Sequence, residues 1–91
     1  MLVLHNEDET MGKFFVEQDG ELLAEMTYAK EPGRMIIEHT EVDESLRGQN
    51  IGLQLVESGI EYAREQRLKI IPLCKFAKKV IEERAEFQDV L

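Results

Sequence analysis

The amino-acid sequence predicts a mixed α/β (α+β) domain in which an antiparallel meander of strands is followed by a helix, a strand and a second helix. Two turn dipeptides, Asp19-Gly20 and Pro32-Gly33, divide the β-rich first half of the chain. Each lies between two apolar segments, which is typical of a turn that joins neighbouring strands. After residue 48 the apolar residues recur at three- and four-residue steps, which is the period of a helix.

The turn dipeptides set the bounds of the strands in the first half. We expect strands over residues 13–18, 21–29 and 34–42, each paired with the next as an antiparallel neighbour. A further short strand is expected over residues 2–5.

The first predicted helix begins after Gly48 and has one face of small and apolar residues. The members of this face are Gly52, Leu55, Val56, Gly59, Ile60 and Ala63. Two of them, Gly59 and Ala63, are small enough to let the helix lie close to a sheet.

The last third of the chain predicts a short strand over residues 68–73, in which Pro72 is tolerated because it lies near the end. The helix that precedes this strand is long enough for a crossover, so the strand can pair in parallel with residues 34–42. A second helix follows and ends near Arg84, and residues 87–91 are expected to pack back as an irregular tail.

Length and composition favour one small domain over residues 1–91 and exclude several classes of function. The apolar segment at the N-terminus is far too short for a signal peptide or a membrane span, and the single cysteine cannot form an internal disulfide. We therefore expect a cytoplasmic protein, a monomer or weak dimer, with no membrane partner. Two histidines and one cysteine, widely spaced, predict no metal site.

The formal net charge of −8 is unevenly distributed along the chain. Residues 1–46 contain 3 Lys or Arg against 12 Asp or Glu, whereas residues 47–91 contain 8 against 7. The acidity argues against nucleic-acid binding, which depends on cations that neutralise phosphates. The split predicts that an anionic ligand binds the C-terminal half and a cationic one the N-terminal half, although acidic strands that merely keep the protein soluble explain it equally well.

The loop at residues 47–52 connects a predicted strand directly to a predicted helix and has the composition of an anion site. Backbone N–H groups at a helix N-terminus attract phosphate, and Arg47 can form two hydrogen bonds to it. Gly48 and Gly52 permit close approach of the backbone, and Asn50 tolerates a left-handed conformation. An ordinary strand-to-helix connection is the alternative, because short glycine motifs are common.

The same loop resembles the acyl-CoA loop of the GNAT superfamily of acetyltransferases, whose pattern is Arg/Gln-x-x-Gly-x-Gly/Ala. Here it reads Arg47-Gly48-Gln49-Asn50-Ile51-Gly52, with Asn50 where the family usually has a second glycine. The chain also resembles the minimal YjdJ-type N-acetyltransferase domains in His39-Thr40-Glu41-Val42, Pro72-Leu73-Cys74 and the closing segment 86–91. The resemblance implies a minimal GNAT-like fold and acetyl-CoA as the cofactor. It implies cofactor binding by Glu41, Val42, Arg47, Gly48, Gln49, Asn50, Ile51, Gly52, Phe76 and Lys78.

Cys74 and His39 are the candidate catalytic residues. Cys74 lies between a predicted strand and a helix N-terminus, where neighbouring lysines and the helix dipole favour a thiolate. It could carry the acetyl group or protonate the CoA thiolate, or it could be an inert buried side chain. His39 precedes the loop and could take a proton from an attacking ammonium, or it could be a strand histidine without a role.

These features together predict an acetyl-CoA-dependent N-acetyltransferase whose acceptor is an unidentified amine, either a small molecule or a protein lysine. Transfer could be direct, with His39 as the base, or could pass through an acetylated Cys74. Two other classes of protein remain: a module that binds CoA or acyl-CoA without turnover, and a purely structural interaction domain.

Overall fold

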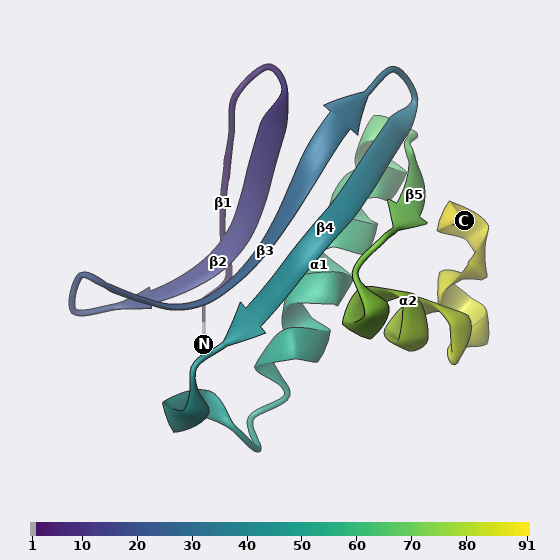
Figure 1. Ribbon diagram of the computed structural model, residues 1–91. Coiled ribbons are helices and arrows are strands. Elements are labelled where there is room, and N and C mark those ends of the chain that lie inside the picture. The colour runs from purple at the N-terminus through teal and green to yellow at the C-terminus, as the bar shows by residue number, and fades with distance from the viewer. Residues whose placement is uncertain (1) are drawn as a thin grey trace.

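Five strands form one sheet in the order of the sequence, in the computed structural model that describes residues 2–91 (Figure 1). Met1 of the predicted domain lies outside the described residues. The strands are β1 (Leu4–Glu7), β2 (Met11–Gln18), β3 (Glu21–Glu31), β4 (Arg34–Val42) and β5 (Lys69–Pro72). The first four pair antiparallel, whereas β4 and β5 pair in parallel, as the crossover helix predicted.

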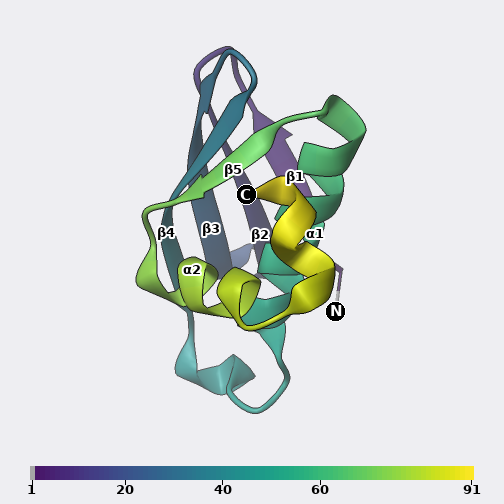
Figure 2. The same ribbon diagram turned by 90° about the vertical axis from the view of Figure 1, so that its right-hand side faces the viewer.

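Three of the four helices lie on one face of this sheet, and the fourth, the short 3₁₀ helix η1 (Glu44–Leu46), lies beyond the end of β4 (Figure 1 and Figure 2). The three are α1 (Ile51–Gln66), α2 (Lys75–Glu82) and the short 3₁₀ helix η2 (Ala85–Val90). Helix α1 packs against β2, β3 and β4, whereas α2 packs against β4 and β5. No helix among residues 2–91 is long and apolar enough to cross a membrane.

Two elements differ from the sequence-based expectation in position or kind, and the bounds of β2, β3, β5 and α2 differ from it by one or two residues. The strand expected over residues 2–5 lies at Leu4–Glu7, because the Asp8 carboxylate accepts hydrogen bonds from the Thr10 and Met11 N–H groups and closes the hairpin there. The tail expected to be irregular is the 3₁₀ helix η2. Its inner side chains are buried and Arg64 of α1 forms an ion pair with Asp89 at 2.7 Å, so the tail is anchored to the domain.

The core lies between the sheet and the buried face of α1. That face contains Ile51, Leu55, Val56, Gly59, Ile60 and Ala63. Gly59 is small as expected: a Cβ there would lie 2.7 Å from Met26 Cε of β3. Gly52 was expected on this face but packs against Phe76 of α2 instead, and Ile51 occupies the core.

A bulge in β4 reverses the direction of its side chains. Thr27 pairs with His39 and Tyr28 with Ile37, so Glu38 is one residue too many for β3. Ile37 is fully buried on the helix-covered face, and one extra residue places Thr40, rather than His39, on that same face. His39 therefore lies on the opposite face of the sheet.

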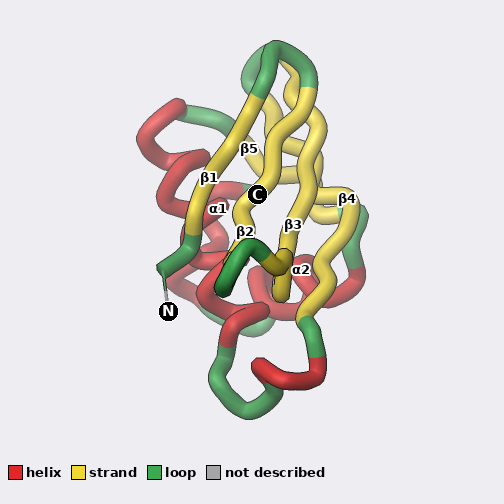
Figure 3. Tube along the Cα trace, turned by 90° about the vertical axis from the view of Figure 1, so that its left-hand side faces the viewer, coloured by secondary structure: helices red, strands yellow, loops and turns green. Residues whose placement is uncertain are grey.

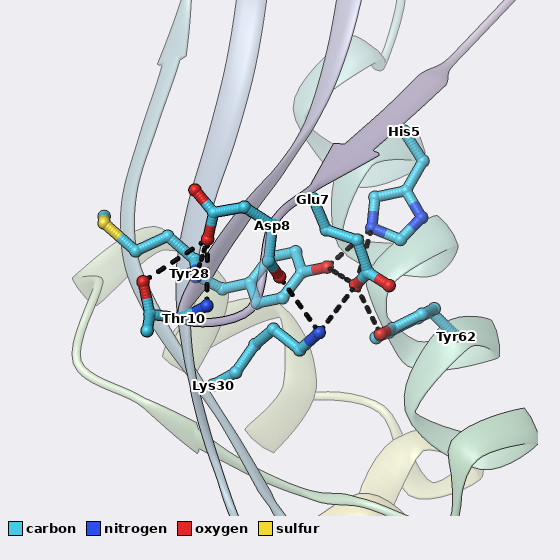
Figure 4. A network of polar contacts seen from close by, with 8 residues as sticks. His5, Glu7, Asp8, Thr10, Tyr28, Lys30 and Tyr62 are labelled. Atoms are coloured by element: carbon cyan, nitrogen blue, oxygen red, sulfur yellow. Dashed lines mark hydrogen bonds and ion pairs between the residues drawn. The ribbon is translucent and has the colours of Figure 1, made fainter.

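A polar network joins the N-terminal strands to α1 (Figure 4). The Glu7 carboxylate accepts hydrogen bonds from the Tyr28 hydroxyl at 2.9 Å and the Tyr62 hydroxyl at 2.6 Å, and Lys30 Nζ lies 3.5 Å away. Since the Tyr28 proton goes to Glu7, His5 Nε2 must donate to Tyr28 Oη, 2.6 Å away. The network thus holds His5 with its proton on Nε2.

We expect acidification to weaken the fold through His5. Burial holds the pKa of His5 below its ordinary value of 6.5, an effect that Glu7 opposes and Lys30 strengthens. A histidine whose folded pKa is lowered binds its proton more readily when unfolded, so the free energy of unfolding should fall as pH decreases through 6.5. The melting temperature measured from about pH 8 to about pH 5.5 should show this.

His5→Gln is the matched control, because the glutamine amide can still donate to Tyr28 but does not titrate. Its melting temperature should depend less on pH over that interval. Equal pH dependence in the two proteins would exclude His5 as the cause.

Candidate functional site

Strands β4 and β5 separate halfway along β4, and a groove opens on the helix-covered face beside the point of separation. Pairing between them ends at Ile37 and Pro72, and the N–H groups of Leu73 and Cys74 both donate to the Ile37 carbonyl. Beyond Ile37, β4 continues to Val42 while the chain after β5 turns into α2. The groove is about 720 Å³ in volume and lies between the end of β4, the start of α1 and α2.

The N-terminus of α1 lies at this groove. Gln54 N–H donates to the Asn50 carbonyl in the first turn, so the N–H groups of Ile51, Gly52 and Leu53 have no acceptor inside the helix. Ile51, Gly52 and Leu53 all line the groove. These N–H groups and the positive end of the helix dipole suit an anionic group such as a phosphate.

The loop before α1 needs two left-handed residues. Gly48 has φ of 81° and Asn50 has φ of 57° with ψ of 30°. Asparagine is among the few residues with a Cβ that adopt this conformation readily, so Asn50 replaces a glycine without disturbing the turn. Its side chain makes no capping hydrogen bond to α1 and lines the groove.

Close contact between α1 and α2 shapes the other wall of the groove. A Cβ at Gly52 would lie 2.7 Å from Phe76 Cζ, so the Phe76 ring lies directly against the first turn of α1. The ring is 42% exposed despite this contact. Gly52 is therefore required for the packing of Phe76 at the groove.

Cys74 is the residue just before α2 and is half-buried beside β4. Its Sγ lies 3.4 Å from Thr40 Oγ1, and Thr40 lines the groove. Burial alone would raise the pKa of the thiol, but hydrogen bonds with Thr40 and with the N–H groups of Ala77 and Phe76 outweigh it. The pKa of Cys74 is consequently lowered, which favours its ionisation.

His39 projects from the other face of β4. Its side chain is 50% exposed, and Nε2 lies 3.5 Å from Glu41 Oε2. Across the sheet, Glu25 of β3 faces Glu41, and the ligand atoms of these three residues all lie within 4.8 Å of one another, a spacing that could hold a metal ion. Among the described residues no hydrogen bond joins His39 to Cys74, because the backbone of β4 separates their side chains.

The structure brings most of the expected cofactor-binding residues together. Seven of them line the groove: Val42, Arg47, Gly48, Asn50, Ile51, Gly52 and Phe76. Gln49 lies in the same loop, where its carbonyl accepts a hydrogen bond from the Gln54 side chain, and Lys78 is exposed on α2. Glu41 instead lines a separate groove on the acidic side of β4.

Sequence reasoning did not find every residue of the groove. The additional lining residues are Thr40, Leu46, Leu53, Val80 and Arg84. Arg84 follows α2, and it adds a second cation to Arg47 at the groove. The position of Arg84 depends on the packing of α2 against α1, which no local pattern specifies. The alternation of side chains along β4 would place Thr40 on the groove side only if the bulge at Glu38 were known.

The sequence and the fold match a known family of proteins. The sequence pattern of the GCN5-related N-acetyltransferase family matches residues 13–90. The chain belongs to this family, which uses acetyl-CoA. A search of curated proteins found no match.

Solved structures agree with this assignment. A GCN5-like protein from Staphylococcus aureus is 37% identical, with a TM-score of 0.75 over 96% of this chain and 85% of its own. The ribosomal-protein-S18-alanine N-acetyltransferase of Escherichia coli is similar in fold, with 17% identity, a TM-score of 0.69, and coverage of 85% of this chain and 53% of its own. A protein from Clostridium acetobutylicum, solved with acetyl-CoA, has 16% identity, a TM-score of 0.64, and coverage of 81% and 56%. This chain therefore spans about half the length of these two larger proteins.

Proposed function

We propose that this protein transfers the acetyl group of acetyl-CoA to an amine, and that the groove at the start of α1 binds the cofactor. The observation that carries the proposal is the conjunction of three N–H groups without helical acceptors, two left-handed loop residues and Arg47 at one end of a groove. The N–H groups of Ile51, Gly52 and Leu53 would hold the pyrophosphate. Arg47 is 77% exposed, and its ion pair with Glu44 at 3.6 Å is weak enough to exchange for a phosphate.

The opening between β4 and β5 supports a division of roles between the two candidate catalytic residues. Cys74 lies on the face of the groove and His39 on the opposite face, so each can reach the opening from its own side. The bound thioester would supply an activated carbonyl carbon, at which a carbon–nitrogen bond forms and the carbon–sulfur bond breaks. In this reaction His39 Nε2 takes one proton from the ammonium, so that the neutral amine attacks the carbonyl carbon. The Cys74 thiol gives its proton to the departing sulfur, and the second proton that the nitrogen loses restores the Cys74 thiol.

This arrangement favours direct transfer over a covalent acetyl-cysteine. A covalent route with His39 as the base for Cys74 needs the two side chains within hydrogen-bond distance, and β4 lies between them. The same geometry favours proton transfers by both residues at one carbonyl carbon, because the two faces of the sheet are accessible to each other only where β4 and β5 have separated.

Calorimetric titration with acetyl-CoA at low and moderate salt tests the binding site. We expect micromolar or tighter affinity that weakens with salt, because the ligand is polyanionic. Arg47→Ala should lower the affinity about tenfold and reduce its salt dependence. Arg67→Ala, at the other end of α1, removes the same charge and should leave the affinity unchanged.

Two outcomes would contradict the proposal in different ways. If acetyl-CoA produces no heat and leaves the melting temperature unchanged at millimolar concentration, the groove does not bind the cofactor and a structural domain remains. Binding without transfer to any amine, in a screen of small amines and lysine peptides, would make the protein a non-catalytic CoA-binding module.

A further inference from the structure

The second face of the sheet has no helix over it (Figure 3). Alternation along the strands makes the two faces different: Phe14, Met26 and Ile37 are buried under the helices, whereas Phe15 and Ile36 point the other way and stay partly exposed. A sheet face with apolar residues and no covering layer is a candidate surface for a partner.

Strand register arranges this open face in three rows that run across the sheet. The first row, Met11, Ala29, Ile36 and Ile71, is entirely apolar. The second contains Asn6, Lys13, Thr27 and His39, and the third contains Leu4, Phe15, Glu25 and Glu41. An apolar strip therefore borders a corner at which Glu25, His39 and Glu41 converge.

Negative charge extends from this corner into a neighbouring groove. The groove is about 380 Å³ in volume and lies between the start of β3 and the end of β4. Its acidic lining residues are Glu25, Glu41, Asp43 and Glu44. Four carboxylates beside an apolar strip are complementary to a partner that carries both cationic and apolar side chains.

The corner is too open to enclose a small amine. His39 is 50% exposed and Glu41 is 74% exposed, so a small cation there would remain in contact with water. A single exposed ion pair contributes little to affinity, whereas a longer ligand gains several such contacts together with the apolar strip. A second copy of this chain fits poorly as the occupant, because a net charge of −8 on each copy repels the other.

We propose that the open face of the sheet is the docking surface for a polypeptide acceptor with a basic segment. The acceptor lysine would enter beside His39, flanking cationic residues would meet Glu25, Glu41 and the acidic groove, and an apolar side chain would lie on the Ile36 strip. This inference rests on the proposed function and names its acceptor class, a protein lysine in a basic context.

Peptide binding can be measured without acetyl-CoA, by amide chemical shifts of the labelled protein. The probe is a flexible lysine peptide flanked by arginines, and the matched peptide has glutamates in place of the arginines. We expect the basic peptide to shift the Thr27, Ile36 and His39 amides, and the acidic peptide and spermidine to shift them much less. Glu41→Lys should lower the affinity for the basic peptide about tenfold.

Glu57→Lys is the matched control, because Glu57 is exposed on α1 and its replacement changes the net charge by the same amount. It should leave peptide affinity within about twofold of wild type. Equal weakening by both variants, equal binding of both peptides, tighter binding of spermidine, or binding that requires added zinc would each overturn the proposal. The proposed function itself is tested separately by the calorimetric titration, in which absence of acetyl-CoA binding would contradict it.

Discussion

Cys74→Ala is expected to lower kcat for acetyl transfer by a factor of about 10² to 10⁴, because the departing sulfur then lacks its proton donor. The Kd for acetyl-CoA should change little, since Cys74 is not among the residues that line the groove. The measurement is the rate of CoA thiol release with the best acceptor, together with a separate binding titration. A large loss of kcat at unchanged Kd is the result that identifies a residue acting in the chemical step.

The pH profile distinguishes the two possible tasks of this thiol. The pKa of Cys74 lies below the ordinary thiol value because hydrogen bonds with Thr40 and with N–H groups of α2 outweigh the effect of burial. If Cys74 acts as the acid, kcat should fall as pH rises through that lowered pKa. If it acts as the nucleophile, kcat should rise instead.

Two variants control the experiment. Cys74→Ser keeps a hydroxyl beside Thr40 but ionises far less readily, so it should recover the melting temperature without recovering the rate. His39→Ala should reduce transfer independently of the Cys74 profile. Unchanged turnover in both Cys74→Ala and His39→Ala would show that the reaction uses other residues.

Gly12→Ala is expected to reduce the free energy of unfolding by about 2–3 kcal/mol, which is a large fraction of the stability of a domain this small. A Cβ at Gly12 would overlap Cζ and Oη of Tyr28. Tyr28 is fully buried, and its hydroxyl is held by Glu7 and His5, so the ring has no room to move aside. Urea unfolding monitored by circular dichroism measures the effect.

Whether Gly12→Ala lowers or raises the free energy of unfolding depends on this overlap. Glycine in a strand usually makes the folded protein less stable than alanine does, so an uncrowded Gly→Ala change would stabilise the sheet. Gly33→Ala is the comparison, because φ there is 73° and no atom lies within 4 Å of the added Cβ. It should cost about 1 kcal/mol through backbone strain alone. A smaller loss for Gly12→Ala than for Gly33→Ala would contradict the steric argument.

Features that depend on nearby residues could be predicted from the sequence. The turns at Asp19-Gly20 and Pro32-Gly33 determine where β2 ends, where β3 begins and ends, and where β4 begins, because a tight turn needs particular residues at particular positions. The helical period identified α1, and the loop composition indicated a candidate anion site at its N-terminus. The resemblance to the family rested on this loop together with the segments 39–42, 72–74 and 86–91.

Features that depend on packing could not be predicted in this way. Arg84 reaches the groove because α2 lies against α1, and Glu7 meets Tyr62 across 55 positions of sequence. Neither contact leaves a periodic pattern in the residues around it. The residues around His5 in the sequence therefore do not indicate the polar network to which it belongs.

The sequence alone determined the order of the elements, the acidic first half and the loop that opens α1, since each follows from residue types within a few positions. Only the tertiary structure decided which face of the sheet each candidate catalytic residue occupies. One extra residue at Glu38 places Thr40 beside Cys74 and turns His39 to the open face. Side chains alternate along a strand, so a one-residue bulge reverses every position after it, and that bulge exists only in the pairing of β3 with β4.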